Sequence, residues 1–427
     1  MSLPTDIVDY ILSFSQVSAL ESCAQSHPIL SKLVERHLYS TIILHDEPLS
    51  PHVHHLCLRI SQLTKRLSDN AHVANYVRNL TIYVNSDLRL VRPTNLEDIL
   101  PIMPMFSQLR KVTFSDYTGR GLSWQRLSMK FRSAFFNTLN QQPLKDVSIG
   151  HISGFPLSLL DNCETVRSLT LYRCSYVHHE GALHKPGPAT LESLSIRDCD
   201  KTSLRNIIAW VRTRRVRSLE FLQRFELFPQ LLSGCVNSLT DLTLDFENIE
   251  SVSCIFLIMC SGADRCWLVS SIFKFSLDDN IPELLPTINT FPFTLSAAPH
   301  LKKLSVCSEP LIRRPFVAYL KAPYWQHYSD VPAITQLIRT APPSLEELIL
   351  KIKFNEGQSG PLPNGHVIWS PFIPLATECS SLPIKVYLSA RFRRMKPQPA
   401  VISDCKEMTR FVEQGVFILM PPASEDA

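Results

Sequence analysis

The feature that most constrains this chain is a short apolar pattern that recurs along it. The pattern is clearest at residues 166–174 and 191–199, which align without a gap at a spacing of 25 residues. Each copy places apolar residues at offsets 0, 3 and 5 and a cysteine at offset 8. This spacing is typical of a short strand whose alternate side chains point inward, with the other positions facing outward.

Seven further copies share the apolar offsets and begin at Val77, Leu109, Leu144, Val216, Leu239, Leu301 and Leu345. The nine copies start 32, 35, 22, 25, 25, 23, 62 and 44 residues apart, and offset 8 is filled properly only by Asn85, Cys174 and Cys199. There we expect the side chain to turn inward and satisfy a neighbouring backbone group. The pattern resembles an irregular leucine-rich repeat, whose period is about 20–29 residues. The resemblance implies a solenoid of parallel strands.

Helical periodicity fills the intervals between several of these strands. Apolar residues recur at helical spacing over residues 127–139, 204–211 and 334–341, and Pro143 and Pro342 follow two of these stretches. Strand, return helix and parallel strand together predict an α/β fold. Residues 250–290 fit this scheme least. They are either a hidden repeat or a segment foreign to the native fold, such as an insertion or a gene-reading error.

Charge and cysteine usage limit the class of protein. The 427 residues carry 43 basic and 39 acidic side chains, a net charge of +4 that does not predict nucleic-acid binding. Basic clusters at residues 212–217 and 391–396 are either helix ends and loops or a nuclear-import or nucleic-acid motif. The twelve cysteines include no C-x-x-C pair, and the sequence shows no secretory signal and no apolar run of membrane length. These features favour a soluble protein of the cytoplasm, the nucleus or both.

The N-terminal segment predicts three short helices and a strand. Pro4 suits a first helical position, a capping box starts at Ser18, Pro28 opens a third helix, and residues 40–44 are extended. Three short helices rarely form a sufficient core, so their apolar faces need the first repeat, another subunit or both.

The segment Leu3-Pro4-Thr5-Asp6-Ile7, with Ile11, Leu12, Leu20 and the run Arg36-His37-Leu38-Tyr39, resembles an F-box of the fungal type. The resemblance implies a Skp-type adaptor of a cullin–RING ubiquitin ligase as partner, and an unknown protein substrate recruited by the repeats. On the family pattern, the residues that face the adaptor are Leu3, Pro4, Ile7, Ile11, Leu12 and Leu20. The stretch from Ser13 to Ser18 is short for the family, and the tryptophan common near the third helix is absent. The alternative is a helical cap on the open end of the solenoid, within a repeat scaffold that has no ligase link.

These patterns divide the chain into an F-box-like unit (1–45), a linker (46–75), a degenerate repeat solenoid (76–395) and a C-terminal tail (396–427). The search for catalytic, cofactor and metal motifs predicts none, so we expect no enzymatic activity. In His179-Glu180-Gly-Ala-Leu-His184 the histidines are five apart, which is the wrong spacing for one zinc ion on a helix.

The outward strand positions predict where a substrate binds. Offset 4 carries mostly small hydroxyl residues, and offset 6 supplies the aromatic and charged side chains common at interfaces. The candidate substrate-binding residues are Tyr83, Tyr172, Arg197 and Asp245. The alternative is that these side chains only solvate the sheet. The sequence therefore favours a non-catalytic substrate receptor without a cofactor.

Overall fold

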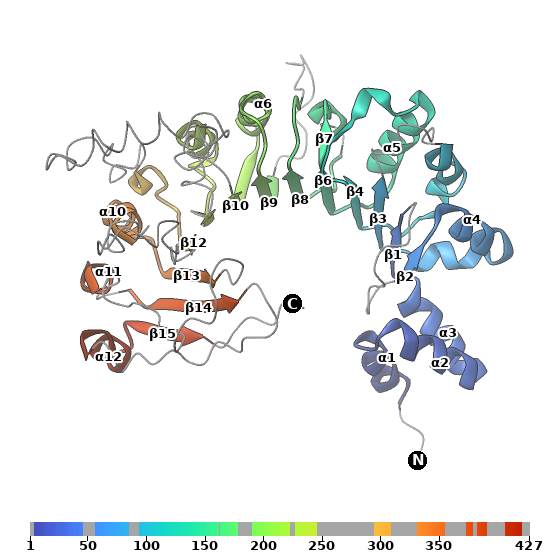
Figure 1. Ribbon diagram of the computed structural model, residues 1–427, viewed down its shortest axis with the longest axis horizontal. Helices are drawn as coiled ribbons and strands as arrows, with labels where there is room; N and C mark the ends of the chain where they lie inside the picture. Colours follow the sequence, from blue (N-terminus) through green and yellow to red (C-terminus); the bar gives the residue numbers. More distant parts are fainter. Residues whose placement is uncertain are drawn as a thin grey trace, which may run out of the picture. The chain divides into compact units, whose positions relative to one another are not determined.

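The structure is a computed structural model that describes residues 4–45, 56–84, 94–161, 163–177, 190–222, 227–245, 294–308, 331–354, 373–378, 382–390 and 406–420. The chain forms two compact units, Met1–Val216 and Arg217–Ala427, and both are α/β with parallel strands (Figure 1). Among the described residues no helix has the length and apolar character needed to cross a membrane.

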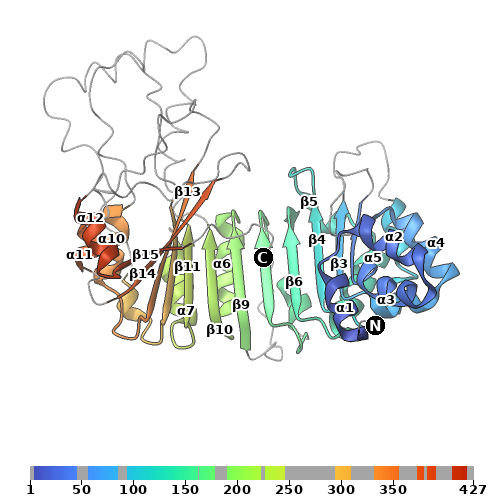
Figure 2. The same cartoon turned by 90° about the horizontal axis from the view of Figure 1, so that it is seen from below.

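The strands of unit 1 pair in parallel in the order β2, β1, β3, β4, β6, β8, β9, and β3, β4 and β6 lie side by side in Figure 2. Matching template positions pair across strands, for example Leu80 with Val112 and Leu169 with Leu194. The predicted register is therefore confirmed. The strand bounds are β1 (Thr41–Leu44), β2 (Leu56–Leu58), β3 (Asn79–Val84), β4 (Lys111–Asp116), β6 (Asp146–Gly150), β8 (Ser168–Tyr172) and β9 (Thr190–Arg197), with a small second pair β5 (Leu122–Ser123) and β7 (Ile152–Ser153).

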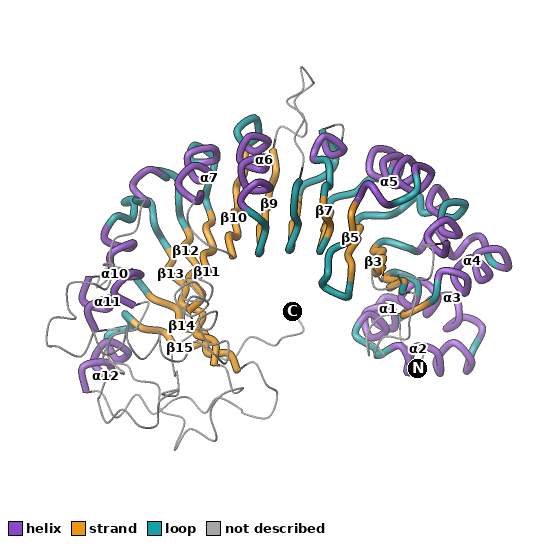
Figure 3. Tube along the Cα trace, turned by 45° about the horizontal axis from the view of Figure 1, so that its top comes forward, coloured by secondary structure: helices purple, strands orange, loops and turns teal. Residues whose placement is uncertain are grey.

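Helices cover one side of these strands (Figure 3). In β3 and β8 burial alternates residue by residue, and Leu169 and Leu171 are fully buried. Burying a side chain of this size contributes about 1.5–3 kcal/mol, so the repeated inward columns form the core. The helices are α1 (Thr5–Ser13), α2 (Val17–Ser26), α3 (Pro28–Leu38), α4 (Ile60–Asp69), α5 (Met129–Gln141) and α6 (Lys201–Val211), and the 3-10 segments are η1 (Ala71–Tyr76), η2 (Thr94–Ile99), η3 (Met103–Met105), η4 (Trp124–Arg126) and η5 (Leu157–Leu160).

Local capping explains where the two longest return helices begin. The Ser128 hydroxyl accepts a hydrogen bond from the amide of Phe131 at 3.2 Å, and the Asp200 carboxylate accepts one from the amide of Ser203 at 2.6 Å. Each bond satisfies an amide that the first turn leaves without a helical partner. The predicted helices at residues 127–139 and 204–211 are confirmed as α5 and α6.

In unit 2 the strands pair in parallel in their sequence order, and the helices again lie along one side (Figure 3). The elements are β10 (Arg215–Leu222), α7 (Phe228–Cys235), β11 (Asp241–Asp245), η8 (Leu295–Ala297), β12 (Lys303–Ser308), α10 (Val331–Arg339), β13 (Glu347–Phe354), α11 (Ile373–Glu378), β14 (Ile384–Ala390), α12 (Lys406–Glu413) and β15 (Phe417–Met420). The third predicted helix is confirmed as α10.

Two predicted boundaries differ from the structure. The expected linker contains β2, which pairs with β1, and α4, whose Ile60, Leu63 and Leu67 are buried. The expected tail contains α12 and β15, and β15 pairs with β14. Both segments carry buried apolar residues, such as Leu63 and Phe417, so the paired strands extend further in each direction than the template matches do.

The prediction of a hidden repeat within residues 250–290 is wrong as far as the sheet is concerned. Strand β11 pairs directly with β12, with Asp241 opposite Lys303 and Leu244 opposite Val306. The edge of β11 that an intervening repeat strand would need is therefore already occupied. Residues 246–293 themselves lie outside the described residues, as does the His179–His184 motif.

The cysteines at offset 8 behave as predicted. The Cys174 thiol is buried and donates to the carbonyl oxygen of Ile149 at 3.3 Å, and the Cys199 thiol reaches the carbonyl of Leu171 at 3.7 Å. Each thiol thus serves a backbone group of the preceding strand in the sheet. Asn85, the third residue of this kind, lies outside the described residues.

Candidate interaction surfaces

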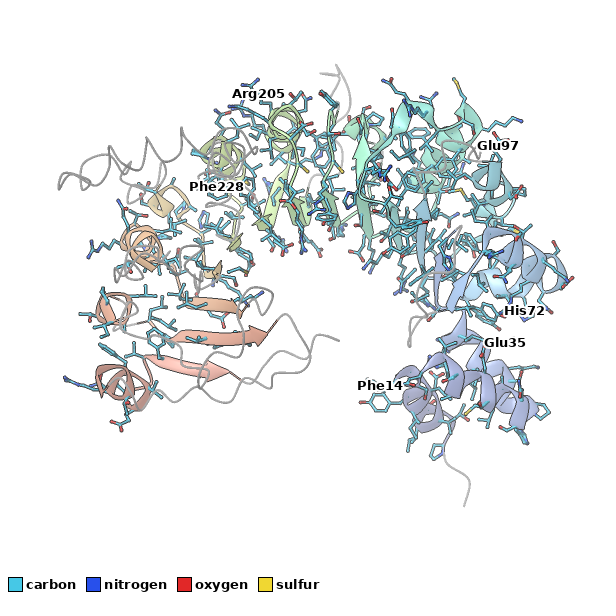
Figure 4. All side chains as sticks on the ribbon, in the orientation of Figure 1. Phe14, Glu35, His72, Glu97, Arg205 and Phe228 are labelled. Carbon is cyan, nitrogen blue, oxygen red and sulfur yellow. The ribbon has the colours of Figure 1, made fainter. Side chains whose placement is uncertain are left out.

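The first candidate surface is one face of helix α1. Ile7, Tyr10, Ile11 and Phe14 are 46%, 67%, 53% and 69% exposed. Their spacing of three, one and three residues puts them along one side of the helix. The rings of Tyr10 and Phe14 meet edge to face at 4.9 Å, and Phe14 points away from the other helices (Figure 4). We call these four residues the α1 face.

Contacts on the opposite side of α1 hold this face outward. Leu12 is 5% exposed, and the Asp9 carboxylate pairs with the His37 imidazole of α3 at 2.7 Å. Leu20 of α2 and Val34 of α3 complete the small core between the helices. The helix therefore turns four large apolar side chains to solvent while its other side is packed.

The residues expected to face the adaptor divide between these two sides. Ile7 and Ile11 belong to the exposed α1 face, and Pro4 is exposed at its N-cap. Leu12 and Leu20 instead pack inside the helical unit, so their side chains are not available at the surface. Leu3 lies outside the described residues. Tyr10 and Phe14 were not among the expected contacts, although their helical spacing from Ile7 is visible in the sequence.

The second candidate surface is the outward side of the strands in unit 1. Register pairing aligns the offset 6 positions into one column across five strands: Tyr83, Ser115, Gly150, Tyr172 and Arg197. Tyr172 and Arg197 are direct neighbours, as predicted from their shared offset. Tyr83 stands three strands away from Tyr172, about 14 Å at the usual strand spacing of about 4.8 Å. Asp245 belongs to β11 of unit 2, where its backbone pairs with Cys307.

Tyr172 is the centre of a cluster at the carboxyl ends of β6 and β8. Its ring meets the His151 imidazole edge to face at 4.8 Å, and the Arg173 guanidinium carbon lies 5.2 Å from the ring centroid. The Arg173 Nε also contacts Asp198 Oδ2 at 3.3 Å. These contacts fix the orientation of the tyrosine and leave a mixed aromatic and charged surface.

A glycine allows this close packing. A Cβ added at Gly150 would lie 2.6 Å from the Ser115 hydroxyl oxygen and 3.7 Å from Cδ1 of Tyr172. The first distance is far below van der Waals contact. The absent side chain at Gly150 therefore makes room for both neighbours in the offset 6 column.

The backbone after three neighbouring strands takes a left-handed conformation at equivalent positions. His151, Arg173 and Asp198 follow β6, β8 and β9 with φ of 53°, 49° and 49°. The left-handed region is uncommon for such residues and costs about 1–2 kcal/mol each. The same turn thus places three successive polar side chains at the carboxyl edge of the sheet, where parallel sheets commonly bind ligands.

The electrostatics of this cluster suit recognition. Burial, followed by the nearby charge of Arg173, lowers the pKa of His151 from its ordinary value of 6.5, so the imidazole is neutral at pH 7. Within the described part of the chain, no three His, Cys, Asp or Glu side chains are grouped as ligands for a metal ion. The cluster offers aromatic faces, guanidinium groups and a carboxylate, which are groups that bind a partner's side chains.

Comparisons with known proteins add no identification. No protein-family model matches the chain. No curated protein matches it either.

Proposed function

We propose that this chain is a non-catalytic substrate receptor of an SCF-type cullin–RING ubiquitin ligase. In this proposal the α1 face docks on the Skp-type adaptor, and the repeats bind a protein substrate. The observation that carries the proposal is the exposure of four large apolar side chains on one face of a helix whose opposite side is packed. The F-box-like run Leu3-Pro4-Thr5-Asp6-Ile7 leads into this same helix.

The size of the face suits a specific partner. Completing the burial of one large, half-exposed apolar side chain contributes about 1–2 kcal/mol. Four such residues contribute about 4–8 kcal/mol before the cost of association, a substantial share of the roughly 8 kcal/mol that a micromolar complex requires. A contiguous exposed apolar patch on a soluble protein commonly marks an interface.

The repeated geometry supports a leucine-rich-repeat solenoid as the substrate-binding part. In unit 1 the template strands β3, β4, β6, β8 and β9 pair with one another at matching offsets, and helices or 3-10 segments lie between β3 and β4, between β4 and β6 and between β6 and β8. The cluster around Tyr172 and Arg197 is the proposed substrate contact. It combines aromatic and guanidinium groups at a carboxyl strand edge, on a backbone fixed by the sheet.

A second candidate function is a repeat scaffold whose N-terminal helices act only as a cap. Contacts between the helices and the rest of unit 1 favour it. Glu35 of α3 pairs with His72 of η1 at 3.3 Å (Figure 4). Arg66 Nη1 also donates to the Tyr39 hydroxyl at 2.9 Å. A cap of this kind shields the first strands. It gives the exposed α1 face no role.

A titration with purified Skp-type adaptor tests the proposal. Serine at both Ile7 and Ile11 is expected to weaken adaptor binding about 30- to 1,000-fold, because two buried isoleucine contacts of about 1–2 kcal/mol each are lost. Met129 on α5 is 75% exposed, so Met129→Ser is the matched control and should leave the affinity unchanged. A folded wild-type chain that does not bind the adaptor, or a double variant that binds it equally well, would overturn the receptor role.

A further inference from the structure

A column of cations lies at the amino ends of four neighbouring strands in unit 1. Arg78, Arg110, Lys145 and Arg167 each occupy the position immediately before β3, β4, β6 and β8. Arg110, Lys145 and Arg167 are exposed, and Arg78 is half-buried. We call these four residues the basic column.

Backbone hydrogen bonds hold the basic column in line. Each carbonyl of the column accepts a hydrogen bond at 2.7 Å from the backbone amide of the next residue in the column. The three bonds run from the Arg110 amide to the Arg78 carbonyl, from the Lys145 amide to the Arg110 carbonyl, and from the Arg167 amide to the Lys145 carbonyl. Successive residues of the column are therefore one strand apart, about 4.8 Å, and its ends are about 14 Å apart.

No residue of the basic column has an ion pair within the part of the chain that the structure describes. Equivalent positions in unit 2 behave differently. Lys302 and Glu346 precede β12 and β13, their backbones make the same bond at 2.8 Å, and their side chains pair at 2.9 Å. Side chains at this position are thus able to reach a partner on the neighbouring strand. In unit 1 four cations occupy it in succession, and the exposed Glu192 follows Arg167, with its amide donating to the Arg167 carbonyl at 2.7 Å.

Neighbouring like charges on adjacent strands destabilise a sheet, although water and salt screen the repulsion at the surface. An anionic ligand along the column would remove this repulsion and pair with several cations at once. The residue that follows each cation is the first residue of its strand. Among these first residues of β3, β4, β6 and β8, Lys111 adds a fifth positive charge and Asp146 is the one carboxylate.

We infer that the basic column binds an acidic, extended segment of a protein partner. The inference names the substrate class for the proposed receptor and so rests on the proposed function. An extended segment of about five residues spans 14 Å at about 3.3 Å per residue. Its carboxylates would meet the four cations in turn.

The same observations disfavour a single-stranded nucleic acid as the ligand. Such ligands bind through a basic groove combined with aromatic side chains that stack on the bases. The residues that follow the basic column are Asn79, Lys111, Asp146 and Ser168, and none is aromatic. The column is also short, and the chain as a whole has a net charge of only +4.

Fluorescence anisotropy of a labelled hexaglutamate peptide tests the inference on the full-length chain. The test variant is Arg110→Glu/Lys145→Glu. The control is Lys130→Glu/Arg205→Glu, which makes the same charge change at exposed positions of α5 and α6; Figure 4 shows Arg205 on the helix side. We expect at least a tenfold loss of hexaglutamate affinity in the test variant and less than a twofold change in the control. Because the substituted side chains are exposed, both variants should keep the wild-type circular dichroism spectrum.

The neutral variant Arg110→Gln/Lys145→Gln should show an intermediate loss, and wild-type affinity should fall with added salt. Equal losses in test and control variants, no binding by the wild type, or tighter binding of a single-stranded oligonucleotide than of hexaglutamate would each overturn the inference. The assay contains no adaptor. A chain that binds the adaptor but not hexaglutamate would therefore disprove the acidic-segment inference alone, and the reverse result would disprove only the ligase role.

Discussion

The buried ion pair between Asp161 and Arg214 allows the most quantitative prediction. The two side chains are 11% and 2% exposed, and Arg214 Nη2 donates to Asp161 Oδ1 at 2.6 Å. The same oxygen accepts from Trp210 Nε1 at 2.9 Å, and the guanidinium carbon lies 3.8 Å from a Trp210 ring centroid. One carboxylate therefore satisfies both a buried cation and a buried indole.

Alanine at position 161 leaves both donors without their acceptor. A buried hydrogen bond to a charged group contributes about 1.5–3 kcal/mol, and removing one partner of a buried pair costs about 3–5 kcal/mol. We therefore expect Asp161→Ala to lower the free energy of opening by about 3–4 kcal/mol. Asp161→Asn keeps one acceptor oxygen and should cost about 1–2 kcal/mol.

Native-state hydrogen exchange of β8, β9 and α6, followed by mass spectrometry, measures this opening free energy locally. Arg214→Met removes the cation that Asp161→Ala leaves unpaired, so the double variant should be more stable than additivity predicts, by at least about 1.5 kcal/mol. A loss below 1 kcal/mol for Asp161→Ala, or strict additivity of the two substitutions, would refute the reasoning.

Three further predictions concern single side chains. Gly150→Ala should destabilise the chain by about 1–3 kcal/mol in urea unfolding, because its Cβ would meet the Ser115 hydroxyl oxygen at 2.6 Å. Adding Ser115→Ala should recover part of that loss. If Gly150→Ala left the stability unchanged, the strands would be able to shift apart freely. The pKa of His151 is lowered in the fold, so the unfolded state binds its proton more readily and stability should fall as pH drops below 6.5. Asparagine tolerates the left-handed backbone, so His151→Asn should make the thermal unfolding midpoint depend less on pH between pH 5 and 7. An unchanged pH dependence would exclude His151 as the source of the loss of stability at low pH. Burial raises the pKa of Cys235 to about 12. In the folded chain at pH 8, iodoacetamide should therefore label Cys235 much more slowly than the half-buried Cys23. Equal labelling rates at the two cysteines would contradict the burial of Cys235.

Much of the strand register could be predicted from sequence because the inward positions must be apolar at fixed offsets. This constraint placed Tyr172 beside Arg197, and their backbone pairing in β8 and β9 confirms that neighbourhood. The strands at the two ends, β2 and β15, were not predicted for the same reason. Strand β2 has only three residues, and β15 lacks the full offset pattern, so neither offers enough positions to match.

Tertiary contacts explain the other differences. Arg214 belongs to a basic cluster that suggests a solvated helix end, yet Asp161, far away in sequence, makes it a buried residue. The left-handed backbone at His151 leaves no sequence signal, because the residue is not a glycine. Periodicity predicted α1 as a helix but not which side of it packs. That choice depends on Leu20, Val34 and the contact between Asp9 and His37.

The central claim is that the α1 face is the docking surface for a Skp-type adaptor. Hydrogen–deuterium exchange of the full chain, with and without saturating adaptor, tests it most directly because it locates the contact. The account predicts slower exchange within Thr5–Ser13 and unchanged exchange in β6, β8 and β9. A complex that leaves α1 unprotected, or no complex with a folded chain, would contradict the account.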